Sequence, residues 1–388
     1  MNRHSWDELA ARRTRIRGCL LGGAIGDALG NPVEFLSLAA IRAAHGMVGL
    51  TTLVPDADGA VGRVTDDTQM TLFTAEGLIR AHARAWSKGI GGAETAIVRY
   101  SYLRWLDTQN HPEPPPAGPS YDPVRSGWLR LQPWLYACRA PGNACLSGLE
   151  SDHVPAPHAA LDGTPGPVNP HSKGCGTVMR SAPFGLTGHP ARQCFELAAR
   201  CAQITHGHPT GYYAAGAFAA MMAYLLEGDS LEGAVLRAME LLSGYPAHEE
   251  TLAALRSAVS LATEGDPSPE KAESLGGGWV AEEALAIAVY SALAPASADR
   301  DPVRSALLLA VNHSGDSDST GSLCGNLVGA RHGDLALPPN WLALTEGRAT
   351  IAEVADDLAM EFHPFTDTRD ERDPHNDAFF PRDRYPHG

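Results

Sequence analysis

The sequence contains seven cysteines but lacks any Cys-x-x-Cys pair. Disulfide frameworks usually use an even number of cysteines, and structural zinc sites use closely spaced ones. We therefore expect neither feature in this chain, and a reducing cytoplasm is its simplest setting. The cysteines are spread over positions 19, 138, 145, 175, 194, 201 and 324.

Long hydrophobic runs are also missing. The longest apolar block, AAGAFAAMMAYLL at residues 214–226, has thirteen residues, whereas a transmembrane helix needs about 20. An earlier run, GCLLGGAIGDALG at residues 18–30, is short and is interrupted by Asp27, which argues against a signal peptide. We expect residues 214–226 to form a buried helix.

Positive charge is scarce. Lys and Arg together number 30 against 45 Asp and Glu, which gives a formal net charge of −15 at pH 7. A field of this sign repels phosphate backbones and anionic membranes. We expect neither a nucleic-acid partner nor a membrane partner, and a small anionic ligand would need a specific cradle.

Segments that alternate polar and apolar residues, as strands do, are almost absent, and residues 51–64 are expected to be a loop. Apolar residues instead recur every three to four positions, or in Ala- and Leu-rich runs, which is typical of helices. No interior linker interrupts the pattern, so we predict an all-α fold in a single domain over residues 1–362. The predicted helices span residues 6–29, 66–86, 92–107, 191–204, 210–227, 230–243, 247–263, 279–293, 302–311, 319–331 and 349–361.

Two proline-rich stretches, residues 107–123 and 139–171, break the helical pattern. Proline lacks a backbone donor and blocks the preceding turn, so neither stretch is a continuous helix. We treat residues 107–171 as an excursion that carries at most a short helix and either wraps the surface or covers a site as a lid. Residues 363–388 are charged and proline-rich, which predicts a loosely attached C-terminal tail.

Glycine motifs of the P-loop and dinucleotide-binding kinds are absent, but acidic motifs are present. VTDDTQM at residues 64–70 opens an apolar helical run with Thr65, Asp66 and Asp67. Taken alone, it predicts an ordinary helix start, since threonine is a good N-cap and carboxylates favour the positive end of a helix dipole. The preceding residues are not an EF-hand loop, because Val61 occupies the sixth position, where glycine is required.

A second acidic helix start, HSGDSDSTGS at residues 313–322, lies far from the first. Asp316 and Asp318 are two positions apart, and in an extended turn their carboxylates would point the same way. Oxygen ligands of this kind suit hard cations such as Mg²⁺ or Mn²⁺ better than zinc. A third acidic position, Glu34, follows the glycine-rich residues 18–30 and alone would be an ordinary surface residue.

Together these motifs resemble the ADP-ribosylglycohydrolase family. The resemblance follows the family's order through GCLLGGAIGDALG, VTDDTQM, SKGCGTVMRSAPFG (172–185), ITHGHPTGYYAAGAF (204–218) and SGDSDSTGS. It implies an all-α orthogonal bundle of helices with a dinuclear Mg²⁺ or Mn²⁺ centre. It also implies an ADP-ribosylated protein as the substrate and ADP-ribose as the product.

The resemblance implies roles for individual residues. The metal ligands would be Thr65, Asp66, Asp67, Asp316, Asp318 and Ser319. Many relatives have threonine where this chain has Ser319, and the neighbouring Thr320 leaves open which hydroxyl is the ligand. Asp66, Asp67 and Glu34 would serve catalysis, Glu34 matching a glutamate near the metals in some members. Five carboxylates carry a charge of −5, which two divalent ions nearly neutralise and one does not, so the charge count favours two metals.

The remaining motifs resemble the family's substrate cradle. The substrate would contact Glu34, Gly174, Cys175, Gly176, Thr177 and His206, with backbone N–H groups of the glycine-rich turn aimed at the diphosphate. Local features equally permit a plain glycine turn before a helix. Arg180 fits an ion-pair partner in the core, while Tyr212 and Tyr213 fit either packing or an adenine pocket. Cys175 has no positioned histidine base, so we interpret it as a lining residue rather than a nucleophile.

These roles predict a hydrolase that cleaves the bond at ribose C1″ of an ADP-ribosylated acceptor. The metals would bind the 2″- and 3″-hydroxyls and activate a water, with Asp66 or Asp67 as ligand and proton acceptor. Arginine is the first choice of acceptor because it is common in bacterial members. Serine-linked, O-acetyl-linked or nucleic-acid-linked ADP-ribose is the alternative, which Glu34 keeps open. A non-catalytic ADP-ribose-binding protein is disfavoured because the oxygen ligands are complete; the preferred metal, the target and the oligomeric state stay open.

Overall fold

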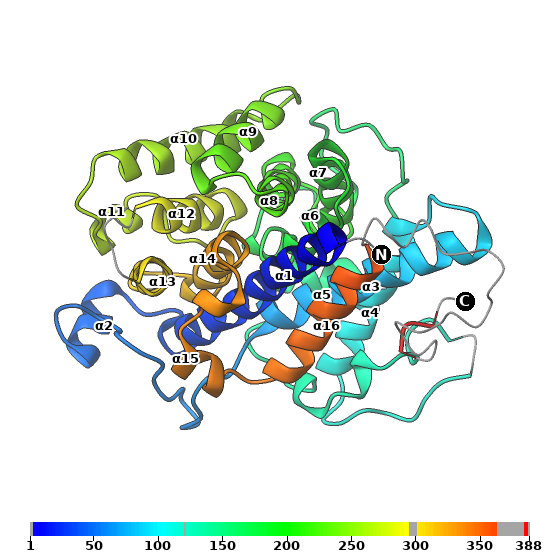
Figure 1. The fold of residues 1–388 in the computed structure, drawn as a ribbon, viewed down its shortest axis with the longest axis horizontal. Helices are drawn as coiled ribbons and strands as arrows, with labels where there is room; N and C mark the ends of the chain where they lie inside the picture. The colour runs from blue at the N-terminus through cyan, green and yellow to red at the C-terminus, as the bar shows by residue number, and fades with distance from the viewer. Residues whose placement is uncertain (1–2, 120–121, 295–300, 363–383, 387–388) are drawn as a thin grey trace.

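The computed structural model describes residues 3–119, 122–294, 301–362 and 384–386. In these residues it contains sixteen α-helices, five short 3₁₀ helices and no β-strand beyond two isolated bridges. The protein is therefore all-α, as the apolar periodicity predicts (Figure 1). One bridge, Pro55 to Val61, lies in the expected loop. No helix in the described ranges is long and apolar enough to cross a membrane.

All the predicted helices are present, with ends that shift by a few residues. They are α1 (Arg3–Gly30), α3 (Asp66–Lys88), α4 (Glu94–Gln109), α7 (Ala191–Ala202), α8 (Pro209–Glu227), α9 (Leu231–Leu242), α10 (Glu249–Thr263), α12 (Ala281–Leu293), α13 (Pro302–Val311), α14 (Ser317–His332) and α16 (Arg348–Glu361). Short helices have too few turns to show a period, and the sequence did not predict them. They are α2 (Leu38–His45), α5 (Asn143–Leu149), α6 (Ala182–Gly185), α11 (Pro269–Glu273) and α15 (Pro339–Leu344).

The ends of the long helices follow local chemistry. Helix α3 begins after Thr65, whose hydroxyl accepts a hydrogen bond from the N–H of Asp67, and it ends at Gly89 in the left-handed conformation. Helix α8 begins with Pro209 after His208, and Gly228 ends it with φ 103°. Side-chain caps at the first turn are the usual start signal of a helix, and glycine after the last turn is the usual stop signal.

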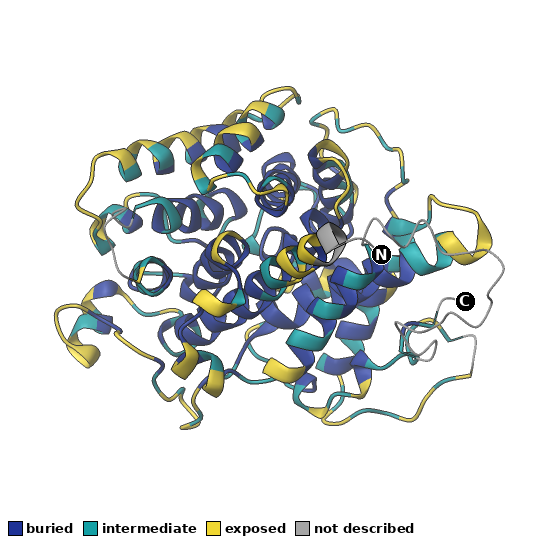
Figure 2. Ribbon diagram, viewed as in Figure 1, coloured by how far each residue is buried: buried dark blue, intermediate teal, exposed yellow. Residues whose placement is uncertain are grey.

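Helices α8 and α12 form the middle of the core. Residues 214–226 are buried apart from Tyr224, which confirms the buried helix expected there. Alanine supplies much of this helix, and its small side chain lets neighbouring helices pack closely. Helices α2, α9 and α10 lie at the outside, with exposed outer faces (Figure 2).

Helices α1 and α14 cross with almost no side chain between them. Four glycines of α1 at four-residue spacing face small residues of α14 in antiparallel order: Gly18 faces Gly329, Gly22 faces Gly325, Gly26 faces Gly321, and Gly30 faces Ser317. A Cβ added at Gly26 would lie 1.9 Å from the carbonyl oxygen of Gly321. Glycine permits this approach of two backbones. Because the two helices are antiparallel, the last turn of α1 meets the first turn of α14 (Figure 1).

In its described residues, the excursion at residues 107–171 contains the last residues of α4, the helix α5, and the 3₁₀ helices Leu129–Leu131 and Pro133–Leu135. Residues 140–144 of this excursion line the cavity described below. Its action as a lid stays a prediction.

Most of the predicted tail, residues 363–383 and 387–388, lies outside the described residues. Residues 384–386 differ from the expectation of a loosely attached segment. The Arg384 guanidinium forms an ion pair with Asp357 at 2.7 Å and lies over the ring of Trp128, and the buried Tyr385 hydroxyl donates to Asp357. A buried carboxylate on α16 needs such partners, and the C-terminal segment supplies them.

Candidate metal and substrate site

The three acidic motifs meet at one cavity of about 440 Å³. That volume is typical of small-molecule sites. The charged residues that line it are all acidic: Glu34, Asp66, Asp67, Asp316 and Asp318. No Lys or Arg lines this cavity in the described part of the chain. The acidic residues therefore have no cationic side chain beside them in the cavity wall.

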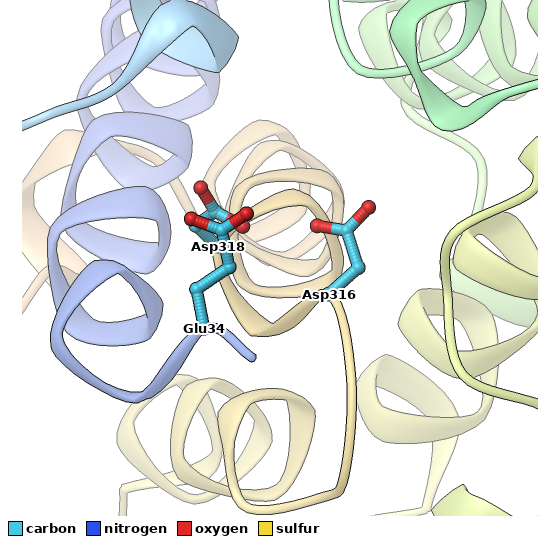
Figure 3. Close-up of side chains that lie close together, drawn as sticks. All are labelled: Glu34, Asp316 and Asp318. Carbon is cyan, nitrogen blue, oxygen red and sulfur yellow. The ribbon is translucent and has the colours of Figure 1, made fainter. Parts of the chain in front are cut away.

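Glu34 comes to the cavity through the α1–α14 crossing. The 3₁₀ helix Asn31–Val33 follows α1 directly, and Glu34 caps its end. Oxygens of Glu34, Asp316 and Asp318 all lie within 4.8 Å of one another, although Glu34 and Asp316 are 282 positions apart in the sequence. Figure 3 shows Glu34 reaching from the end of α1 toward Asp318, with the Asp316 carboxylate nearby.

Asp316 and Asp318 converge in a different way from the one expected. They do not share an extended turn: Asp316 is the N-cap of α14 and accepts a hydrogen bond from the N–H of Ser319, while Asp318 is the second residue of the helix. The prediction of an extended turn was wrong because the helix begins earlier than its apolar pattern does. The N-cap side chain and the first-turn side chain both lie at the open end of the helix.

The structure separates the two hydroxyls that the sequence left open. Ser319 lines the cavity. The Thr320 hydroxyl points into the core, where it can donate its one proton to the carbonyl oxygen of either Ala310 or Asp316, at 2.8 and 2.9 Å, and it contacts His313. Ser319 is therefore the hydroxyl available to a ligand in the cavity.

The first turn of α3 supplies the other two acidic residues of the cavity lining. Asp66 and Asp67 line the cavity and are buried, whereas Thr65 caps the helix behind them and does not line it. Oδ1 of Asp67 is buried without a hydrogen-bond partner among the described residues. Unsatisfied buried acceptors are rare, and a bound ion or water is the ordinary explanation. The N–H of Gly142 donates to Asp66 at 3.4 Å, which links the excursion to the site.

The electrostatics of the cluster are unfavourable without a cation. Burial, followed by the charges of Asp318 and Asp316, raises the pKa of Glu34 to about 10. Burial and then Asp318 also raise the pKa of Asp66, Asp67 and Asp316 well above the usual range. Buried like charges raise the free energy of the ionised form, and a divalent cation reverses that effect. The chemistry of the donor set therefore fits a hard divalent cation.

A less charged wall carries the predicted substrate cradle. Gly174, Cys175, Gly176 and His206 line the cavity, but Thr177 does not. The N–H of Thr177 donates to the Gly174 carbonyl at 3.4 Å and its hydroxyl to Gly211 at 3.0 Å, so Thr177 braces the turn. The N–H of Cys175 donates to the Trp279 carbonyl at 3.1 Å. The expected row of four free N–H donors is thus wrong for two of its members, because the local turn uses the N–H of Thr177 and a tertiary contact uses that of Cys175.

His206 lies behind the two glycines of the cradle. Burial lowers its pKa to about 3, so the imidazole is neutral. The Thr205 hydroxyl lies 2.7 Å from Nδ1 and accepts a hydrogen bond from Arg180 at 2.6 Å. With Arg180 donating to it, the hydroxyl is free to give its own proton to Nδ1, which leaves an N–H at Nε2 as a neutral donor for the cavity. Arg180 therefore acts through Thr205 rather than as an ion-pair partner.

A comparison with protein-family models matches residues 8–366 to the family described as ADP-ribosylglycohydrolase. The chain belongs to the ADP-ribosylglycohydrolase family. The sequence is 29% identical to an uncharacterized protein of Archaeoglobus fulgidus, over 90% of this chain and 97% of that protein. It is 25% identical to the ADP-ribosyl-(dinitrogen reductase) glycohydrolase of Rhodospirillum rubrum, over 85% of this chain and 89% of the relative.

Two further comparisons agree with this family of ADP-ribosyl hydrolases. The chain is 25% identical to the ADP-ribosylarginine hydrolase Tri1 of Serratia proteamaculans, over 89% of this chain and 78% of that one. A solved structure titled an ADP-ribosylglycohydrolase-related protein complex aligns with a TM-score of 0.60 and 25% identity. It covers 91% of this chain and 99% of its own.

Several residues in the ADP-ribosylglycohydrolase motifs lie outside the cavity lining. Tyr212 and Tyr213 are buried, and their hydroxyls donate to the Thr164 and Leu161 carbonyls, so they serve packing. His208 caps α8 and His313 contacts Thr320.

Cys175 lines the cavity, and burial with the nearby Asp316 raises its pKa well above 9, which disfavours a thiolate nucleophile.

Asp27 is the polar residue of this site that the sequence reasoning missed. It lies in α1, fully buried, and accepts hydrogen bonds from the N–H groups of Thr65 and Thr68 at 3.0 and 3.2 Å and from the Thr68 hydroxyl at 2.5 Å. It thereby fixes the first turn of α3 behind Asp66 and Asp67. Its signal in the sequence was a single acid within an apolar run, since a buried carboxylate must have partners.

We expect Asp27→Ala to weaken metal binding as well as stability. Three donors at the start of α3 would lose their acceptor, which costs about 1–3 kcal/mol of unfolding free energy. Misplacing Asp66 and Asp67 should weaken Mg²⁺ or Mn²⁺ binding by about 10- to 100-fold, the usual effect of losing a partner behind the ligands. Calorimetric titration with each metal and thermal unfolding measure the two effects.

A matched control is Asp301→Ala, which removes the N-cap of α13. It should cost about 1 kcal/mol of stability and leave metal affinity unchanged. Equal metal affinities in wild-type protein and folded Asp27→Ala would show that Asp27 only caps α3.

Proposed function

We propose that the protein hydrolyses the N-glycosidic bond of ADP-ribosylated arginine in proteins and releases ADP-ribose. One observation carries the proposal: three acidic segments, around Glu34, Asp66 and Asp318, converge on one cavity in a member of the ADP-ribosylglycohydrolase family. A relative named ADP-ribosylarginine hydrolase supports arginine as the acceptor.

In this proposal Asp66, Asp67, Asp316, Asp318 and the Ser319 hydroxyl would hold two Mg²⁺ or Mn²⁺ ions, with Glu34 beside them. The ions would supply Lewis-acid binding of the ribose hydroxyls and a water of lowered pKa. Thr65 would serve as the cap that orients Asp66 and Asp67, since its hydroxyl is 3.4 Å from both the N–H and Oδ2 of Asp67. Two ions fit the five carboxylates better than one because they leave a charge near −1.

The residues of the cavity divide the remaining tasks. The unpartnered Oδ1 of Asp67 is free to accept the proton of the attacking water. Nε2 of His206, together with the backbone at Gly174 and Gly176, donates to the diphosphate without adding a charge. Residues 140–144 of the excursion line one side of the cavity, where a lid would limit access of bulk water.

We expect purified protein with Mg²⁺ or Mn²⁺ to release ADP-ribose from an ADP-ribosyl-arginine peptide, and EDTA to abolish release. Among the described residues, the cavity wall contains no cationic side chain that could replace the ions. Chromatography of released ADP-ribose gives the rate, and re-adding each metal identifies the preferred ion. Calorimetry should give about two ions per chain.

The same assay separates the alternatives. Peptides carrying ADP-ribose on serine, O-acetyl-ADP-ribose and a nucleic-acid end with ADP-ribose complete the panel. Faster release from any of these would replace arginine as the acceptor, and Glu34 within the acidic triad keeps serine as the second candidate. Tight ADP-ribose binding with no turnover of any conjugate would identify a non-catalytic binding protein.

A further inference from the structure

Two exposed aromatic side chains from distant parts of the chain form one wall of the acidic cavity. Phe35 and Trp279 both line it, and their rings stack with centroids 5.1 Å apart and planes 23° apart. Their exposed fractions are 66% and 42%. Exposed aromatics are common singly, but a stacked pair at the edge of a cavity indicates a contact surface for a ligand.

The backbone holds this pair firmly in place. Phe35 has φ 67°, a conformation that residues with a Cβ seldom adopt, and its N–H donates to the Gly315 carbonyl. Gly315 in turn donates to Leu36. On the other side, the Trp279 carbonyl accepts from Cys175, and the adjoining Gly277 carbonyl accepts from Asp316. Strain of this kind persists where the surroundings enforce it, and it concentrates at binding sites.

The charges of the cavity indicate which ligand the pair accepts. Glu34 precedes Phe35 directly, and it is the lining carboxylate that the proposed function leaves outside the ligand set of the two ions. Aromatic faces attract cations through the ring quadrupole, and guanidinium is planar, permanently charged and rich in donors for a nearby carboxylate. A neutral ring such as adenine would gain from stacking but nothing from Glu34.

We propose that Phe35 and Trp279 form an acceptor subsite that takes the guanidinium of the modified arginine, with Glu34 accepting its N–H groups. This inference rests on the proposed function, since the guanidinium is the leaving group of that reaction. The pair places the acceptor side chain beside the carboxylate cluster and selects arginine over neutral acceptors. Serine conjugates carry no planar cation and gain nothing from the pair.

The test compares wild-type protein with Phe35→Leu, Trp279→Leu and the double variant. Leucine also carries a Cβ, so its steric preference at the positive φ of position 35 is close to that of phenylalanine. Each single change should raise KM for an ADP-ribosyl-arginine peptide by about 3- to 30-fold, the range of one cation–π contact. KM for an ADP-ribosyl-serine peptide and the Kd of free ADP-ribose should stay unchanged. Trp86→Leu, at a tryptophan of α3 with 46% exposure outside the cavity lining, is the matched control.

A binding measurement that needs no turnover keeps this inference separate from the proposed function. Butylguanidinium should bind the wild-type protein loaded with Mg²⁺ and ADP-ribose more tightly than its neutral isostere butylurea, and the double variant should lose that preference. Inactive wild-type protein that still prefers butylguanidinium would refute the proposed hydrolysis and support the subsite. If the double variant kept the preference for butylguanidinium, the subsite would be overturned. If the double variant instead bound free ADP-ribose more weakly than the wild-type protein, the subsite would also be overturned, and the two rings would be assigned to adenine binding.

Discussion

Asp318→Asn is expected to lower the rate of ADP-ribosyl-arginine hydrolysis by more than about 100-fold. Losing a partner behind a metal ligand already costs about 10- to 100-fold, so losing a central ligand should cost more. Asp318 is central because its carboxylate lies within 4.8 Å of both Glu34 and Asp316 and is the neighbouring charge that most strongly raises the pKa of Asp66 and Asp67. The rate is measured with Mg²⁺ and with Mn²⁺ in excess, and Asp66→Asn should behave alike.

Stability distinguishes this loss from misfolding. Asparagine has the shape of aspartate and removes one charge from a buried cluster of like charges, so metal-free Asp318→Asn should unfold at a temperature equal to or above that of metal-free wild-type protein. Added metal should stabilise wild-type protein more than the variant, because binding to the native state raises its stability in proportion to RT ln(1 + [L]/Kd). Sites that bind ions commonly trade stability for function in this way.

Asp152→Asn provides the control, because the Asp152 side chain is fully exposed and forms an ion pair with Arg99 at the surface, at 3.5 Å. It should change neither the rate nor the response to metal, since exposed ion pairs contribute little. Full hydrolysis by folded Asp318→Asn with saturating metal would exclude the metal-dependent mechanism proposed above.

The sequence predicted the parts of this fold that depend on local chemistry. The long helices follow apolar periodicity, and the cap at Thr65 follows a preference that acts over three residues. The cavity residues Asp66, Asp67, Asp316, Asp318 and Glu34 could be chosen because their motifs are ordered as in a known family. Their chemical roles stay proposals that the experiments above test.

The sequence could not predict which tertiary hydrogen bonds single polar groups form. The N–H of Cys175 and the hydroxyls of Thr177 and Thr320 are all used by partners in other segments. A donor that looks free in a motif can be used by a partner far away in the chain, as the N–H of Cys175 is by Trp279, 104 residues later. The aromatic pair of Phe35 and Trp279 was missed for the same reason, because neither residue has a local partner that marks it.

The most consequential feature hidden from the sequence is the glycine crossing. Gly18, Gly22, Gly26 and Gly30 at four-residue spacing predict one glycine-lined helix face, but only the fold shows that this face pairs with α14. The close crossing of α1 and α14 brings Glu34, which follows the end of α1, near Asp316 and Asp318 at the start of α14. The metal site thus depends on residues that carry no functional group.

Gly26→Ala should therefore be among the most damaging single changes in the protein. In an open helix this substitution would stabilise by roughly 1 kcal/mol through helix propensity. Here the new methyl would lie 1.9 Å from the Gly321 carbonyl oxygen and 2.3 Å from its carbon, so two backbones must move apart. We expect a loss of at least about 3 kcal/mol of unfolding free energy, at the upper end for overpacking, measured by chemical denaturation.

The control is Gly91→Ala, where the added Cβ meets nothing closer than 3.7 Å. Its unfolding free energy should stay within about 0.5 kcal/mol of wild type. If Gly26→Ala folds at low temperature, its affinity for Mg²⁺ should still fall, because α1 and Glu34 shift away from α14 and the acidic triad opens. Unchanged stability and unchanged metal affinity together would show that α1 and α14 are not held at the glycine contact, and the link from helix crossing to metal site would be lost.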